Sequence, residues 1–219
     1  MAEEKSEKKK KTAREIIENY DGPKVRIMEV CGTHTHEIFR LGIRKLLPEQ
    51  VELISGPGCP VCVTPVSFID EAIYLALEKG VTICTFGDLV RVPGTRMSLA
   101  GAREQGAEIH VVYSPADAEE YAREHSDRQV TFLSVGFETT TPAGCLSVKA
   151  AKTDGLENYS ILTANKTMPQ AYEVLKGSAD VFLYPGHVNA ITGTRLCEAL
   201  TEEGVSGVVA GFTAKELMT

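Results

Sequence analysis

Several patterns with a clear functional meaning are missing from this chain of 219 residues. No apolar stretch is long enough to span a bilayer, and the start, MAEEKSEKKKKTAREII, lacks the apolar region of a secretory signal. Neither the glycine-rich nucleotide-binding patterns nor the G-x-S-x-G of serine hydrolases occurs. Nucleotide binding and serine hydrolysis are therefore unsupported, and we expect a cytoplasmic protein that neither enters nor crosses a membrane.

Basic residues are concentrated nowhere except in the first dozen positions. The chain has 30 acidic and 23 basic residues and a net charge of −7, so no nucleic-acid-binding surface is expected. Residues 1–20 are predicted to be a basic tail that is disordered or helical, because blocks of like charge repel one another and stay solvated.

The composition predicts a globular protein whose cysteines do not form structural disulfides. With 43% hydrophobic residues, the chain can bury one substantial core or two modest ones. In a reducing compartment, its six cysteines are expected to be metal ligands, redox groups or buried small residues.

Short β-rich runs alternate with amphipathic helical stretches along the whole chain, which predicts an α/β fold with parallel sheets. The pattern breaks near residues 92–95. We therefore expect two similar βαβ lobes flanking a cleft, the first over 21–95 and the second over 96–219, with the last strand (about 205–212) as a candidate to return to the first lobe. Strands are predicted over 25–30, 51–55, 81–86, 109–113, 130–137, 159–164, 179–184 and 207–212.

Three of the expected helix starts pair a hydroxyl residue with proline. Thr64-Pro65, Ser114-Pro115 and Thr141-Pro142 share this arrangement. The hydroxyl can accept a hydrogen bond from a first-turn N–H, and proline at the first helical position gives up a donor that would have no partner.

The unusual residues of the chain follow the predicted strands. Cys31, the turn over 56–59 and the segments 136–138 and 185–187 all come where a strand ends. Because ligands of open parallel sheets bind beyond the carboxyl ends of the strands, we expect these residues to line one cleft between the lobes.

Cys31 lies between a predicted strand and a predicted helix. Backbone N–H groups and the helix dipole at such a position favour the thiolate, which is the form that binds soft metals. Gly32 leaves room for close approach, and His34, His36 and Glu37 add proton carriers or ligands. A buried inert cysteine is the alternative, although the segment GTHTHE is too polar for a core.

Cys59 and Cys62 form a C-x-x-C pair in the proline-rich turn GPGCPVC. Two sulfurs at this spacing can bind one metal ion or close a disulfide. Together with Cys31 they indicate a metal site, for which iron suits the soft thiolates. A zinc-stabilised interaction module and a thiol-disulfide oxidoreductase remain open as alternatives.

The other candidates are ambiguous. Glu138, in GFETTTP, is either a helix-capping carboxylate or a proton-transfer group, and His187 could be either structural or functional. We interpret the remaining cysteines as packing residues: Cys84, Cys145 and Cys197.

Six segments with distinctive wording occur in order along the chain: MEVCGTHTHEIFRLGIR, GPGCPVCVTP, TFGDLVRVPG, VVYSPADA, GFETTTP and PGHVNAITG. They resemble the signature segments of the HypD family of nickel–iron hydrogenase maturation factors, and the resemblance runs from about residue 25 to residue 211. The family resemblance implies two α/β lobes flanking a cleft.

The resemblance also implies a function. A HypC-type chaperone would bind the chain, an Fe(CN)2CO fragment (iron with CN and CO ligands) would be assembled on the complex and passed to the hydrogenase, and a HypE-type carrier would deliver cyanide. The protein would be a cofactor-assembly scaffold with redox-active thiols rather than a conventional turnover enzyme.

The resemblance assigns roles to individual residues. Cys31 would bind the iron, with Gly32 and Thr33 beside it, and a partner cysteine would share the metal. Cys59 and Cys62 would form the redox-active pair, and His34 and Glu138 would have proton-transfer or orienting roles.

One departure from the family concerns the end of the chain. Family members continue into a C-terminal region whose cysteines bind a 4Fe-4S cluster, and no such ligand motif occurs here. We therefore expect a truncated or fragmentary chain without the electron supply to the Cys59 and Cys62 pair.

Overall fold

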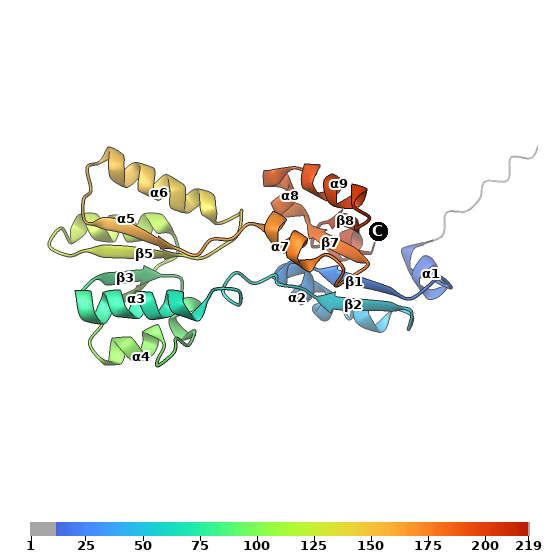
Figure 1. Ribbon diagram of the computed structural model, residues 1–219, viewed down its shortest axis with the longest axis horizontal. Helices are drawn as coiled ribbons and strands as arrows, with labels where there is room; N and C mark the ends of the chain where they lie inside the picture. Colours follow the sequence, from blue (N-terminus) through green and yellow to red (C-terminus); the bar gives the residue numbers. More distant parts are fainter. Residues whose placement is uncertain (1–11, 219) are drawn as a thin grey trace, which may run out of the picture. The chain divides into compact units, whose positions relative to one another are not determined.

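The computed structural model describes residues 12–218, which contain two four-stranded parallel sheets. The chain forms two compact units, as Figure 1 shows. The first unit contains the residues up to Gly58 and those from Tyr172 onward, and the second unit contains Cys59–Ala171. The predicted α/β fold class with two parallel-sheet lobes is confirmed, whereas the cleft remains a prediction.

The first unit has the strand order β2-β1-β7-β8. Its helices include α2, which joins β1 to β2 in a βαβ unit, and the short 3-10 helix η1 (Ile43–Lys45). The strands are β1 (Val25–Glu29), β2 (Val51–Ser55), β7 (Val181–Pro185) and β8 (Ser206–Ala210). The α-helices are α1 (Ala13–Glu18), α2 (Gly32–Arg40), α8 (Gly186–Thr192), α9 (Arg195–Glu202) and α10 (Ala214–Leu217).

The second unit has the strand order β4-β3-β5-β6. Every residue of the central strands β3 and β5 is buried, as expected for parallel strands covered by helices on both faces. The strands are β3 (Thr82–Thr85), β4 (Ile109–Val111), β5 (Val130–Ser134) and β6 (Tyr159–Thr163). The helices are α3 (Val66–Lys79), η2 (Leu89–Arg91), α4 (Leu99–Glu104), α5 (Pro115–Glu124) and α6 (Thr141–Thr153), and α7 (Met168–Leu175) contains the return to the first unit.

The division of the chain differs from the expected boundary between 21–95 and 96–219. The chain leaves the first unit after Gly58 and returns at Tyr172, so α3 and β3 belong to the second unit. In sequence, α3 and β3 continue the alternation of β1, α2 and β2 without interruption. Periodicity shows that a strand exists but does not show which sheet receives it.

The predicted hydroxyl cap is present at only one of the three helix starts. Ser114 caps α5 by accepting a hydrogen bond from the N–H of Asp117, with Pro115 at the first helical position. Thr64 instead donates its hydroxyl to Pro60 O, 2.9 Å away. Thr141 lies inside α6 and donates to Phe137 O at 2.9 Å. The predictions at Thr64 and Thr141 are wrong because nearby carbonyls accept these hydroxyls.

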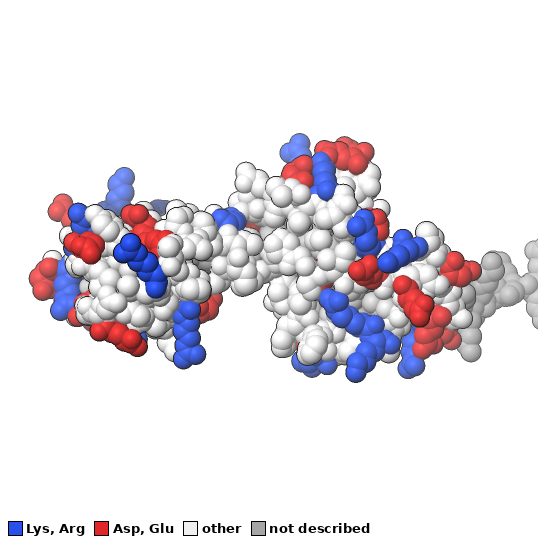
Figure 2. Space-filling model, turned by 60° about the horizontal axis from the view of Figure 1, so that its bottom comes forward, with Lys and Arg blue, Asp and Glu red and all other residues white. Residues whose placement is uncertain are grey.

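Charged side chains of both signs are interspersed over the face of the molecule that Figure 2 shows. Within residues 12–218, no helix has the length and apolar character needed to cross a membrane. The expectation for the basic tail, 1–20, lies largely outside the described residues, although its end contains α1, which begins with a capping box formed by Thr12 and Glu15.

Candidate functional site

Four strands of the first unit end at one edge of its sheet, because they are all parallel. Cys31 follows β1, and a Gly-Pro-Gly turn follows β2. Gly186 and His187 begin α8 directly after β7, and Gly211 follows β8. This edge is where open parallel sheets place their ligands.

Cys31 is the N-cap residue of α2 and is 8% exposed. Its backbone is extended, and its carbonyl accepts hydrogen bonds from the N–H and the hydroxyl of Thr35 at 3.1 and 3.3 Å. Gly32 and Thr33 are the first two residues of the helix. The predicted position of Cys31 between a strand end and a helix start is therefore confirmed.

Gly58 holds the backbone of Cys31 in place. The N–H of Gly32 donates to Gly58 O at 3.2 Å, and a Cβ added to Gly58 would lie 2.2 Å from Gly32 N and 2.4 Å from Cys31 C. Glycine is therefore required at position 58. The contact also occupies the first N–H of α2, so this N–H is not among the free donors that favour a Cys31 thiolate. Cys59 is the next residue in the chain.

A buried carboxylate two residues before Cys31 was missed by the sequence analysis. Glu29, at the end of β1, is fully buried, and its Oε1 accepts hydrogen bonds from Ser55 Oγ at 2.7 Å and Arg44 Nη2 at 3.3 Å. Arg44 also donates to Leu53 O at 2.8 Å. Oε2 of Glu29 has no hydrogen-bond partner among the described residues. The group ties the ends of β1 and β2 together, and the acid inside a strand pattern was the signal that could have revealed it.

His34 lies one turn after Cys31 and is fully buried. Its Nε2 donates to Gly211 O at 2.9 Å, because a carbonyl can only accept, so Nδ1 of the neutral ring keeps its lone pair. Within the described part of the chain, Nδ1 has no hydrogen-bond partner. Burial lowers the pKa of His34, and the backbone of Gly211 and Ala210 opposes that shift. Burial therefore favours the neutral imidazole, whose Nδ1 lone pair is the group that could accept a proton or bind a metal.

The ring of Phe212, which follows β8, packs against two rings that follow other strands, those of His34 and His187. The centroid of the Phe212 ring lies 4.8 Å from that of His34 and 5.0 Å from that of His187. His187, whose role the sequence does not decide, thus belongs to the same edge as Cys31 and His34. It contacts the ring that packs against His34.

His36 and Glu37 do not join this group. The exposed His36 pairs with Glu37 at 3.2 Å, and Arg40 Nε lies 3.0 Å from Glu37 Oε2. Arg40 lowers the pKa of the Glu37 carboxyl, which desolvation opposes. These residues form a surface ion-pair network on α2, so His34 is the residue of this segment that is buried with Cys31.

Cys59 and Cys62 lie in a turn that precedes α3 in the second unit. Cys59 is half-buried and Cys62 is exposed. The N–H of Cys62 points at Cys59 Sγ over 3.4 Å, and the adjacent Cys59 thiol raises the pKa of Cys62. The turn therefore favours a proton on Cys62 and directs a hydrogen-bond donor at the sulfur of Cys59.

Glu138 follows β5 in the second unit. Its Oε1 accepts a hydrogen bond from the N–H of Met168 at 2.8 Å, the first residue of α7. Its Oε2 is buried and has no partner among the residues described. Glu138 therefore stabilises the start of a helix 30 residues away and keeps one oxygen available.

The other three cysteines have different surroundings. Cys84 is fully buried, and burial raises its pKa to about 12, which agrees with a packing role. Cys197 is half-buried and accepts a hydrogen bond from Asn189 Nδ2 at 3.1 Å. Cys145 is exposed, so the packing interpretation is wrong for this residue.

The predicted site residues are thus divided between the units. Cys31, Gly32, Thr33 and His34 lie in the first unit, and Cys59, Cys62 and Glu138 lie in the second. Between residues 12 and 218, no group of three or more histidine, cysteine or acidic side chains lies close enough together to hold a metal ion. Metal binding by Cys31, Cys59 and Cys62 therefore stays a prediction.

The two units form an α/β protein whose candidate residues stand at the ends of parallel strands or in the turn that follows one. The chain belongs to the HypD family, described as "Hydrogenase formation hypA family", whose sequence profile matches residues 7–219. The resemblance drawn from the six sequence segments is confirmed.

Named relatives agree with this assignment. The hydrogenase maturation factor HypD of Rhodobacter capsulatus is 45% identical over 199 residues, which is 89% of this chain and 53% of the relative. The HypD of Cupriavidus necator is 44% identical, and the match covers 90% of this chain and 55% of the relative. The HypD of Escherichia coli K12 is 43% identical, and the match covers 89% of this chain and 53% of the relative. The chain thus spans about half the length of the curated relatives it matches.

One solved structure aligns with much of the chain, but only weakly. It is a ligand-free substrate-binding protein with adhesive properties from Clostridium difficile, 13% identical over 86% of this chain and 74% of that chain, with a TM-score of 0.19. A TM-score this low supports no statement about fold or ligand.

Proposed function

We propose that this chain is the scaffold part of a hydrogenase maturation factor, on which the Fe(CN)2CO fragment of the nickel–iron active site is assembled and from which it is transferred. The observation that carries the proposal is the buried Cys31 at a strand end, in a chain that belongs to the HypD family. Iron with CN and CO ligands is the cargo. A HypC-type chaperone would share it, a HypE-type carrier would supply cyanide, and the reducing cytoplasm would keep the thiols free.

Cys31 and His34 would have different roles in the first unit. A thiolate is a soft ligand that suits low-valent iron, and the Gly58 contact fixes the direction from which Cys31 approaches it. His34 presents a neutral Nδ1 lone pair, so it would accept the thiol proton or bind the iron directly. A cysteine of the chaperone would complete the thiolate set.

Cys59 and Cys62 would act as a redox pair. Oxidation of their two thiols forms one S–S bond and releases two electrons and two protons. These electrons would leave or return one at a time, which is the chemistry that the 4Fe-4S cluster implied by the family resemblance for full-length members would supply. The N–H of Cys62 directed at Cys59 Sγ supports Cys59 as the sulfur that carries negative charge during exchange.

Infrared spectroscopy tests the proposal. The chain is copurified with a HypC-type partner from cells that contain the other maturation proteins, and the cyanide and carbonyl stretching region is recorded. We expect bands from the wild type and from the control Cys145→Ala, whose exposed thiol has no assigned role. We expect none from Cys31→Ala. Bands that persist in Cys31→Ala would remove this residue from the iron site.

A thiol-disulfide oxidoreductase is the second candidate function, favoured by the close Cys59 and Cys62 pair. An insulin reduction assay separates it from the scaffold: turnover that depends on both thiols favours the oxidoreductase, and an inactive chain excludes it. A zinc-stabilised interaction module has no observation that favours it, since it would need three or four ligands from this chain close together and none are grouped within residues 12–218. Stoichiometric zinc in the purified chain, and unfolding when a chelator removes it, would support the zinc-stabilised module.

A further inference from the structure

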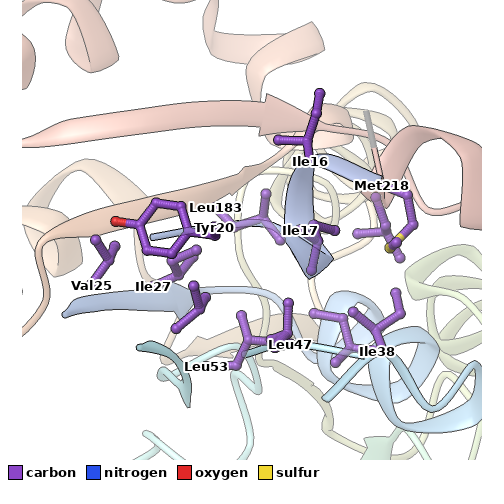
Figure 3. A pocket seen from close by; sticks show the side chains of 13 residues that line it. Ile16, Ile17, Tyr20, Val25, Ile27, Ile38, Leu47, Leu53, Leu183 and Met218 are labelled. Carbon is purple, nitrogen blue, oxygen red and sulfur yellow. The ribbon is translucent and has the colours of Figure 1, made fainter. Parts of the chain in front are cut away.

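The two units differ in their cavities, and the cavity of the first unit offers little to a ligand. It has a volume of about 300 Å³, and Figure 3 shows side chains of α1 and Met218 on one side and side chains of β1, β2 and α2 on the other. Among its lining residues, the only polar side-chain group is the hydroxyl of Tyr20, which already donates to Pro23 O at 2.8 Å. A polar ligand would find no group there to orient it.

A cavity of the second unit has a different lining. It has a volume of about 470 Å³ and lies at the carboxyl ends of β5 and β6, beside the first turns of α6. Ser134, the last residue of β5, and Thr163, the last residue of β6, both line it, and none of its lining residues is charged. This volume falls within the range of small-molecule sites, which form at the carboxyl ends of strands in open parallel sheets.

The body of this cavity is apolar and is kept open by a glycine. A Cβ added to Gly144 of α6 would lie 3.2 Å from Ser134 Oγ and 3.8 Å from Ile161 Cδ1, so an alanine would narrow the space between α6 and the sheet. Val148, one turn later, is 47% exposed although it lines the cavity. An apolar group placed against Val148 and Ile161 would therefore bury surface that is now open to water.

Two polar side chains of the lining are bonded to each other and still have capacity to spare. Asn165 Nδ2 donates to Ser134 Oγ at 3.0 Å. The buried Oδ1 of Asn165 has no hydrogen-bond partner among the described residues. Ser134 is 2% exposed, and because its Oγ accepts the bond from Asn165, its proton remains available to an acceptor. A ligand that satisfies both groups removes the penalty of an unpaired buried acceptor.

The other hydroxyls of the lining already have partners. Thr141 Oγ1 donates to Phe137 O at 2.9 Å, and Thr163 Oγ1 accepts from the N–H of Asn165 at 3.3 Å. The unmet capacity of the cavity is therefore one acceptor, on Asn165, and one donor, on Ser134.

This pair of groups defines the chemistry of the ligand. Asn165 Oδ1 needs an N–H donor, the Ser134 hydroxyl needs an acceptor, and a primary carboxamide presents both from one carbon atom. We propose that the cavity binds a small uncharged carboxamide, with the amide on Asn165 and Ser134 and the apolar body against Val148 and Ile161. The proposal does not depend on the chemistry of Cys31, so the two can fail separately.

The thiol of Cys145 reports binding without taking part in it. Cys145 is exposed and lines the cavity on α6, so a bound molecule would shield it from N-ethylmaleimide. Benzamide is the probe. Acetophenone, in which a methyl group replaces the NH2 group, is the matched control because it has no donor for Asn165. The exposed Cys62 of the same unit lies outside the lining and shows any general effect on alkylation. Peptide mass spectrometry gives both rates.

We expect the two probes to differ. In the wild type, about 10 mM benzamide should slow the alkylation of Cys145 roughly fivefold, as a millimolar Kd predicts for so small a ligand, and leave Cys62 unchanged. Acetophenone should bind about tenfold more weakly, because Asn165 Oδ1 stays unpaired. Asn165→Leu should remove the preference for benzamide, whereas Asn19→Leu, the same change at an exposed position of the first unit, should keep it. The comparison of probes in the wild type decides the question even if Asn165→Leu does not fold.

Three results would overturn the proposal. The first is equal protection of Cys145 by benzamide and acetophenone, which would indicate an apolar cavity that does not select an amide. The second is no protection by benzamide, including the case in which a glutamine-containing peptide protects Cys145, because a protein side chain would then be the occupant. The third is a preference for benzamide that persists in a folded Asn165→Leu.

Discussion

Cys31 of the first unit is 8% exposed and has Gly58 packed on its backbone, whereas Cys59 and Cys62 of the second unit lie half-buried and exposed in a turn. A thiol on a fixed backbone presents one direction to a ligand, which suits metal binding. Thiols in an open turn can reach each other and a reaction partner, which suits exchange. The two sets of thiols therefore differ in their local packing, although Gly58 and Cys59 are adjacent in the chain, and this difference agrees with the separate roles that we propose for them.

The largest expected effect comes from breaking the backbone contact in the first unit. In Gly58→Ala the new methyl group would lie 2.2 Å from Gly32 N, and neither backbone can yield easily. We expect a loss of about 3 kcal/mol in the free energy of unfolding and a severalfold faster alkylation of Cys31. Denaturant unfolding and mass spectrometry of alkylated peptides measure the two effects.

Gly87→Ala is the matched control for this substitution. A Cβ at position 87 would lie 3.5 Å from Val111 Cγ1, which is an ordinary van der Waals distance. This variant should leave both measurements unchanged. If Gly58→Ala behaves like Gly87→Ala, Cys31 is not held by the turn and the contrast between the units disappears.

A smaller loss is expected when Arg44 is removed from the buried Glu29. Arg44→Ala leaves the carboxylate with Ser55 as its remaining side-chain donor. The Arg44 side chain is 44% exposed, so water replaces part of the interaction, and we expect a loss of about 2 kcal/mol in denaturant unfolding. Arg26→Ala, which breaks an exposed pair with Asp180, should have no measurable effect. Equal losses in the two variants would contradict the role of Glu29 in holding the ends of β1 and β2 together.

The contrast between the units could be predicted from the sequence only in part. Strand and helix periodicity and the position of Cys31 at a strand end are local features, and the structure confirms them. The Gly58 contact, the Arg44 bond to Glu29 and the bond from Met168 to Glu138 join residues far apart in the chain. Rules based on the spacing of residues along the sequence cannot predict contacts between residues this far apart. The expected boundary kept β3 in the first lobe, and it differs from the structure for the same reason.

A pH effect distinguishes the buried His34 from an exposed histidine. Burial lowers its pKa below the usual 6.5, so the unfolded chain binds the proton more readily than the folded one. This contribution to stability is fully present above pH 6.5 and is lost as the pH falls toward the lowered pKa. Unfolding free energies at pH 7.5 and 5.5 should differ less in His34→Asn than in the wild type. The control His36→Asn, on the helix surface, should keep the wild-type difference, and a wild-type difference in His34→Asn would contradict the burial argument.

The smallest effect concerns reactivity rather than stability, and it tests whether the thiols of the second unit act as a pair. The neighbouring Cys59 raises the pKa of Cys62, so Cys62 should be alkylated more slowly at pH 8 than the isolated and exposed Cys145. In Cys59→Ala the cause of the shift is gone, and Cys62 should react at a rate close to that of Cys145. Peptide mass spectrometry after timed alkylation gives both rates. An unchanged rate of Cys62 would mean that the two thiols do not influence each other. The proposed redox role of the turn would then be contradicted, whereas the proposed metal-binding role of Cys31 in the first unit would not be affected.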